Sequence, residues 1–208
     1  MRQLDPAARR VLEEMTTTHQ ALFSFSAQLK VEAISDSRHE TATASLVYMK
    51  PNKARVSVRR SDGTSALSVC DGSNRFYIAA KTRKKVKTDA GEKGLLETLS
   101  EANLFIAPVF FYLTSRSAPV RTILPGTAKV LGFGTPLTLD GVAVEVIAAD
   151  VETPQGRARL IFSLGKEDRL LRRLEVNTSY QKQNLSLVET YTEVKSNPKL
   201  DKRAFLAP

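Results

Sequence analysis

The feature that most constrains this fold is the alternation of apolar and polar residues along successive short segments. Between Phe23 and Ala33, every second residue is Phe, Leu, Val or Ala, and polar residues fill the positions between. A period of two residues is typical of β-strands that bury one face. We expect further strands over residues 41–50, 53–60, 65–70, 74–80, 83–88, 128–139, 142–151, 157–164, 170–180 and 185–194. Turn-forming Gly, Pro, Asn and Asp residues separate most of them, as antiparallel hairpins require.

Two segments have helical rather than strand periodicity. Asp5-Pro6 can begin a helix, because Asp accepts hydrogen bonds from free backbone amides and Pro suits the first helical position. Apolar residues then recur at three- and four-residue spacing, which predicts a helix over residues 5–22. Residues 95–114 show the same spacing, with a break expected at Pro108. Their segment Leu104–Leu113 has no polar face, so we expect it to act as a lid on the sheet.

Length and composition favour one domain over residues 1–208. The chain has 42% hydrophobic and 25% charged residues, ordinary values for a globular protein, and no linker divides it. With strands outnumbering helices, the sequence predicts an α+β fold that is mainly antiparallel β. No apolar run of about 18 residues is present, so we expect no membrane-spanning helix.

The sequence offers little support for catalysis, so we expect no enzymatic activity. Its two histidines, His19 and His39, are not part of any metal or acid–base pattern, and no nucleophile-elbow motif is present. Cys70 is the single cysteine, which excludes an internal disulfide and a thiolate metal cluster. We interpret Cys70 as a buried structural thiol, and we expect neither a metal nor a cofactor.

The chain is strongly basic, with a formal net charge of +9. Its densest basic run, KTRKKVK, contains Arg83, Lys84, Lys85 and Lys87. Such a run can bind an anionic membrane surface, and it can equally protect an exposed strand edge. Nucleic acid is not an expected partner, because no aromatic residues are interleaved with the basic ones and Trp is absent.

A sheet with one apolar face and a helical lid can hold an apolar guest between them. Each buried methylene of an acyl chain would contribute about 0.8 kcal/mol. The expected lining and lid residues are Phe23, Phe25, Leu29, Leu46, Tyr48, Val56, Val58, Phe76, Ile78, Phe105, Ile106, Val109, Phe110, Leu113, Val144, Val146, Leu160, Phe162, Leu174 and Val176. For each of them, ordinary packing of the sheet against a helix is the alternative.

Short motifs are distributed over nearly the whole chain: Pro51 and Arg55, Asp71-Gly72 followed by Phe76-Tyr77, and the C-terminal Asp201, Phe205 and Pro208. Together they resemble the LolA/LolB-like superfamily of exported lipoprotein carriers. Within the superfamily, Leu131-Gly132 and Asp140-Gly141-Val142 are most similar to a family of predicted periplasmic proteins of undetermined function.

The resemblance implies an unclosed, half β-barrel with helices covering its concave face. It also implies a carrier that holds a lipid, an acyl chain or a lipoprotein without reaction. We therefore expect an exported, periplasmic monomer whose signal peptide is not part of this sequence, since MRQLDPAARR has no apolar core. The alternative is a protein-interaction or sensor domain that uses the same fold without a lipid guest.

Overall fold

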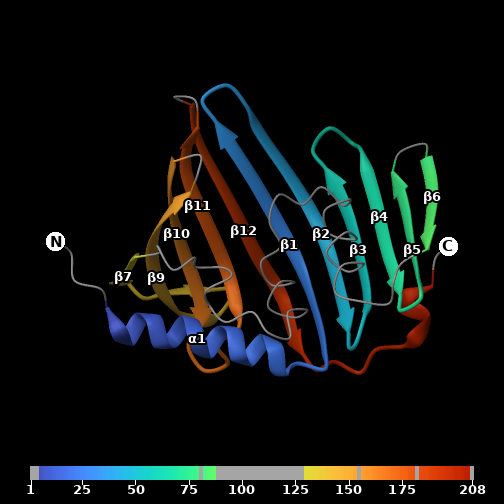
Figure 1. The fold of residues 1–208 in the computed structure, drawn as a ribbon, viewed down its shortest axis with the longest axis horizontal. Coiled ribbons are helices and arrows are strands. Elements are labelled where there is room, and N and C mark those ends of the chain that lie inside the picture. The colour runs from blue at the N-terminus through green and yellow to red at the C-terminus, as the bar shows by residue number, and fades with distance from the viewer. Residues whose placement is uncertain (1–4, 80–81, 88–128, 154–155, 181–182, 207–208) are drawn as a thin grey trace. The chain divides into compact units, whose positions relative to one another are not determined.

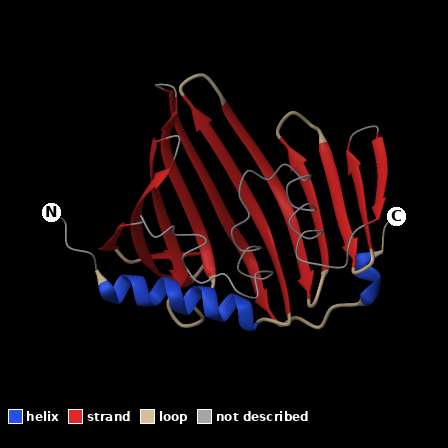
Figure 2. Ribbon diagram, viewed as in Figure 1, coloured by secondary structure: helices blue, strands red, loops and turns tan. Residues whose placement is uncertain are grey.

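The structure, a computed structural model, describes residues 5–79, 82–87, 129–153, 156–180 and 183–206 (Figure 1). Most of these residues lie in β-strands (Figure 2). The strands are β1 (Ser24–Ser35), β2 (His39–Met49), β3 (Lys53–Arg60), β4 (Ser65–Asp71), β5 (Asn74–Ala79), β6 (Thr82–Lys87), β7 (Lys129–Phe133), β8 (Leu137–Leu139), β9 (Val142–Thr153), β10 (Gly156–Gly165), β11 (Leu171–Tyr180) and β12 (Gln183–Ser196). The helical elements are α1 (Pro6–Ala21) and the short 3₁₀-helix η2 (Lys202–Phe205).

The strands form one 12-stranded sheet in the order β6-β5-β4-β3-β2-β1-β12-β11-β10-β9-β7, and β8 also pairs with β9. Every strand pair for which a register is described is antiparallel. The order ends at β6 and at β7, so the sheet is not closed within the described residues. The predicted fold class, mainly antiparallel β with an unclosed sheet, is confirmed.

Helix α1 begins where the sequence predicts. The Asp5 Oδ1 atom accepts hydrogen bonds from the backbone amides of Ala7 (2.9 Å) and Ala8 (3.1 Å), which satisfies two amides of the first turn. One stripe of the helix is buried, as its apolar spacing requires: Ala8, Val11, Leu12, Met15, Thr16 and His19. The helix predicted over residues 95–114 lies outside the described residues.

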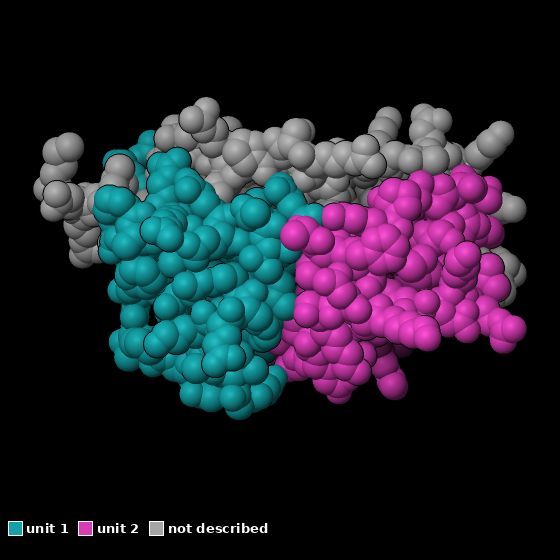
Figure 3. All heavy atoms as spheres, turned by 90° about the horizontal axis from the view of Figure 1, so that it is seen from below, with its two compact units in different colours: residues 1–20, 32–40, 116–190 teal, residues 21–31, 41–115, 191–208 magenta. Residues whose placement is uncertain are grey.

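The chain divides into two compact units (Figure 3). Unit 1 contains residues 1–20, 32–40 and 116–190, and unit 2 contains residues 21–31, 41–115 and 191–208. Three of the boundaries fall inside strands, in β1, β2 and β12. Among the described residues no helix is both long and apolar enough to cross a membrane.

The predicted strand over residues 128–139 is in fact two strands, β7 and β8, which both pair with β9. Between them, the Gly134 amide donates to the Val146 carbonyl (2.7 Å), whereas Pro136 has no amide hydrogen to donate. Asp140 and Gly141 then form the two-residue turn into β9, with φ values of 49° and 77°. Positive φ at both positions suits this Asp-Gly hairpin.

Candidate functional site

Strands β2 to β4 of unit 2 place a set of buried side chains on one face of the sheet. Directly opposed residues share a face, and the register opposes Ala44 to Val58 and Val58 to Ala66. The same face carries Leu46, Tyr48, Ala54, Val56, Ser68 and Cys70, and all nine side chains are buried. We call this set the apolar face of unit 2. Three alanines and one serine of this set have short side chains, which extend less far from the sheet than those of Leu46 and Tyr48.

Strands β9 to β12 of unit 1 form a second buried set. The register opposes Phe162 to Ile147 on one side and to Leu174 on the other, so these three side chains share a face. The remaining members are Ala149, Val151, Ala158, Leu160, Val176 and Leu187. Of the whole set, which we call the apolar face of unit 1, Leu160 and Val176 are half-buried and the others are buried.

Eight of the predicted lining residues lie on these two faces: Leu46, Tyr48, Val56 and Val58 in unit 2, and Leu160, Phe162, Leu174 and Val176 in unit 1. Phe25 and Leu29 are buried in β1. The predicted lining residues did not include the alanines, Ser68 or Ile147.

Four other predicted lining residues lie on the opposite faces, which corrects the sequence assignment. Phe76 and Ile78 oppose Val69 and Leu67, so all four lie behind the apolar face of unit 2. The turn at Asp71 sets this register, because the Asp71 carboxylate accepts hydrogen bonds from the amides of residues 73 and 74. Cys70 therefore pairs with Arg75, and it is Arg75 that shares the apolar face.

Val144 and Val146 are likewise on the reverse side of β9. The register opposes Val146 to Ser163, whereas Ile147 opposes Phe162. Along β9 the apolar residues change phase at this point, so alternation alone does not determine which side faces inward. The two valines instead line a hollow of about 470 Å³ beside Phe133 and Leu137.

Part of the reverse face of unit 2 is covered by η2, an element that the sequence pattern did not predict. Phe205 of η2 is only 1% exposed, and η2 contacts β3 and β4. Arg55 opposes Val69 on this reverse face, and its Nη1 atom donates to the carbonyls of Ala204 (3.3 Å) and Leu206 (3.2 Å). On this reverse face of β4, Val69 is therefore buried, whereas Leu67 is half-buried.

Several predicted residues cannot be assigned to the site. Phe23 is 62% exposed and does not line an apolar face. Strand β6 pairs with β5 as predicted for the basic run, but the side chains of Arg83, Lys84, Lys85 and Lys87 are outside the described part of the structure. The predicted lid residues Phe105, Ile106, Val109, Phe110 and Leu113 also lie outside it.

The buried thiol and histidine have structural surroundings. Cys70 is buried, and its Sγ atom donates to the Asn52 carbonyl (3.1 Å), in agreement with the predicted structural thiol. His19 is fully buried on α1, and its Nδ1 atom donates to the Met15 carbonyl (2.8 Å). Burial is the main cause that lowers the pKa of His19 from 6.5 to about 4, so the ring is neutral at pH 7.

Ion pairs attach α1 to the rest of unit 1. Arg169, in the loop before β11, donates to Glu14 of α1 (3.1 Å) and to Glu145 of β9 (2.5 Å). In the same loop Asp168 binds Arg172, which is buried close to His19. Each of these carboxylates therefore has a cationic partner.

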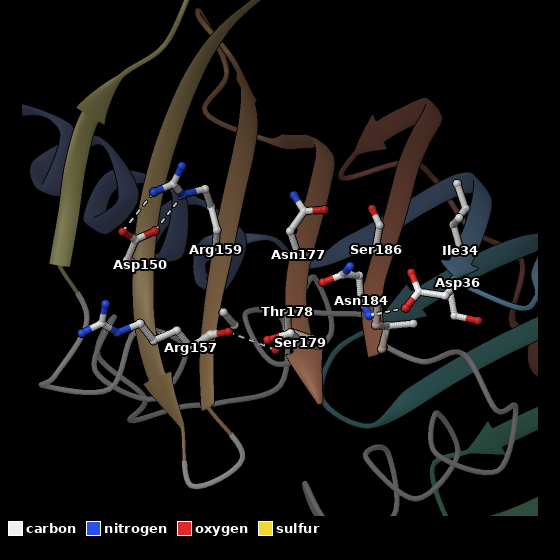
Figure 4. A pocket seen from close by; sticks show the side chains of 13 residues that line it. Ile34, Asp36, Asp150, Arg157, Arg159, Asn177, Thr178, Ser179, Asn184 and Ser186 are labelled. Atoms are coloured by element: carbon white, nitrogen blue, oxygen red, sulfur yellow. Dashed lines mark hydrogen bonds and ion pairs between the residues drawn. The ribbon is translucent and has the colours of Figure 1, made fainter. Parts of the chain in front are cut away.

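Unit 1 also contains a hollow of about 590 Å³ at the ends of β9 to β12 (Figure 4). Arg159 makes two hydrogen bonds to Asp150 (2.8 and 3.1 Å), and Asp36 accepts from the Asn184 amide (3.1 Å). The lining also includes the apolar side chains of Ile34 and Leu185, so this hollow combines polar and apolar surface.

No protein family matches the sequence, and no curated protein is similar to it. Three solved structures are similar to the whole chain. The first is the lipoprotein LppX of Mycobacterium tuberculosis, with 11% identity, a TM-score of 0.56 and coverage of 95% of this chain and 98% of LppX. LprF of Mycobacterium bovis has 10% identity, a TM-score of 0.52 and coverage of 95% and 96%.

The third structure is MucB, with 13% identity and a TM-score of 0.56. The match covers 98% of this chain but 64% of MucB, so this chain spans less than two thirds of that protein. The likeness is one of fold. It agrees with the mainly antiparallel, unclosed sheet that the short motifs implied.

Proposed function

We propose that this protein is an exported carrier that binds a hydrophobic or amphiphilic guest, a lipid or an acylated protein, without chemical reaction. The observation that carries the proposal is the apolar face of unit 2. Its nine side chains, which include the alanines at positions 44, 54 and 66, form a continuous, largely apolar surface over β2 to β4 against which an acyl chain would pack. The fold shared with the lipoprotein LppX is consistent with export.

The energetic basis of such binding is burial of the guest. Ten methylenes of an acyl chain transferred from water onto the apolar face would contribute about 8 kcal/mol. The loss of translational and rotational freedom offsets several kcal/mol of this. We therefore expect the purified protein to bind a fluorescent fatty-acid analogue with about micromolar affinity or better.

Ala66→Leu tests whether the space above this face accepts a guest. If it does, the leucine side chain occupies that space, and the affinity for the fatty-acid analogue falls about tenfold while the melting temperature is unchanged. Ser57→Leu is the matched control, because Ser57 is exposed on the reverse face of the neighbouring strand β3. Uptake should be measured by fluorescence titration and stability by thermal melting.

The opposite result would contradict the carrier function. If the face is a completely packed core, Ala66→Leu lowers stability by about 1–3 kcal/mol through overpacking. Combined with a wild type that takes up no fatty-acid analogue, that result would favour a protein-interaction or sensor domain with the same fold.

A further inference from the structure

The segment of residues 195–206, which begins with the last two residues of β12, runs along the ends of strands in unit 2 and ends beside β3 and β4 (Figure 1). It is fixed at both ends. The Asn197 Oδ1 atom accepts from the Phe23 amide (2.7 Å), and the Ser24 hydroxyl donates to the Pro198 carbonyl (2.7 Å). At the other end, Arg55 donates to two carbonyls of the segment. We call residues 195–206 the basic rim.

The basic rim carries an excess of positive charge that its surroundings do not neutralise. It contains Lys195, Lys199, Lys202 and Arg203 and a single acidic residue, Asp201, which gives a formal net charge of +3. All four cations are exposed, and none forms an ion pair within the described residues. The Asp201 carboxylate accepts from the Arg203 amide (2.9 Å), where it caps η2.

Exposed apolar side chains lie at both ends of this charged segment. Phe23, bound through its amide to Asn197, is 62% exposed, and Leu206, at the end of the rim, is 60% exposed. Single exposed apolar residues are common on protein surfaces. Here, however, Phe23 and Leu206 are the two most exposed large hydrophobic residues of the described chain. Among the described residues of unit 2, they are also the only large hydrophobic residues that are exposed.

We propose that the basic rim, with Phe23 and Leu206, is a docking surface for an anionic lipid bilayer. Cations near such a bilayer gain electrostatic energy from its negative surface potential, while aromatic and aliphatic side chains enter the boundary between headgroups and acyl chains. A nucleic acid would satisfy the cations but would leave Leu206 in water. The surface does not depend on the proposed guest site, since it lies outside the apolar face of unit 2.

The test is co-sedimentation of the purified protein with vesicles. We expect binding to vesicles of mixed phosphatidylglycerol and phosphatidylcholine, little binding to pure phosphatidylcholine, and loss of binding in high salt. The triple variant Lys199→Gln/Lys202→Gln/Arg203→Gln should bind the anionic vesicles about 100-fold more weakly. The variant Phe23→Ser/Leu206→Ser should bind them about tenfold more weakly, with an unchanged melting temperature.

Two control variants make the test specific. Phe133→Ser removes an aromatic residue of unit 1 that is 48% exposed, and it should leave binding unchanged. Lys84→Gln/Lys85→Gln/Lys87→Gln removes charges from β6. If the β6 variant loses vesicle binding and both rim variants keep it, the rim is not the docking surface. Binding to single-stranded DNA but not to vesicles would also overturn the proposal.

The same variants test the docking surface and the carrier function independently of each other. Rim variants that lose vesicle binding should still take up the fatty-acid analogue with wild-type affinity. A protein that binds anionic vesicles but no fatty-acid analogue would retain the docking surface and lose the carrier assignment.

Discussion

Replacing Phe205 by Ala should lower the free energy of unfolding by about 3–5 kcal/mol, the range measured for large-to-small aromatic substitutions in cores. The side chain is 1% exposed, although it lies only three residues before the end of the chain. It belongs to η2, which contacts β3 and β4 and accepts a hydrogen bond from Arg55 at Ala204. Loss of the ring would leave a cavity between η2 and the reverse face of the sheet.

Chemical denaturation monitored by circular dichroism measures this effect, and the neighbouring residue provides its control. Leu206 is 60% exposed, so Leu206→Ala should change stability by less than about 0.5 kcal/mol. Equal effects of the two substitutions would mean that η2 does not cover the reverse face of unit 2.

The second large effect is a dependence of stability on pH that arises from His19. Its pKa is lowered from 6.5 to about 4 in the folded protein, so the unfolded chain binds a proton more readily between these values. The contribution of His19 to the free energy of unfolding is therefore fully present above pH 6.5, and it is lost as the pH falls towards 4. A shift of this size corresponds to about 3 kcal/mol.

His19→Gln removes this contribution, so its unfolding free energy should fall less than that of the wild type between pH 6.5 and 4. Urea denaturation at a series of pH values gives the difference directly. Hydrogen bonds lower the carboxyl pKa values of Asp62 and Asp71 from 3.8, so their contributions to stability are lost at lower pH. Parallel profiles for wild type and variant would show that His19 is not buried in its neutral form.

The sequence predicted the strands better than it predicted the sides on which their residues lie. Helical spacing identified α1 closely, and alternation identified β1 to β3 closely, because each has one clear period. In β4 and β9, however, apolar residues occupy both phases, since η2 covers part of the reverse face of unit 2 and Val144 and Val146 line a separate hollow in unit 1. If the residues of β4 and β5 are paired outward from the turn at Asp71, Phe76 opposes Val69 and is assigned to the reverse face of unit 2.

The candidate site was predicted in part for a related reason. Large residues such as Tyr48 and Phe162 were named as lining residues, whereas Ala44, Ala54 and Ala66, which share the apolar face of unit 2, were not. Phe23 continues the alternation of β1, yet it precedes the first residue of the strand and is exposed. Position in the pattern alone could not distinguish the end of a strand from its interior.

The strand order has a consequence for how the protein forms during synthesis. Strand β1 follows the N-terminal helix, yet its neighbours in the sheet are β2 and β12, the last strand of the chain. Contacts between these regions join residues 148 and 174 positions apart. Because contacts of such high sequence separation form slowly, the sheet cannot be completed until nearly the whole chain has left the ribosome. Until then, β1 has one edge open, which would keep the nascent chain accessible to chaperones.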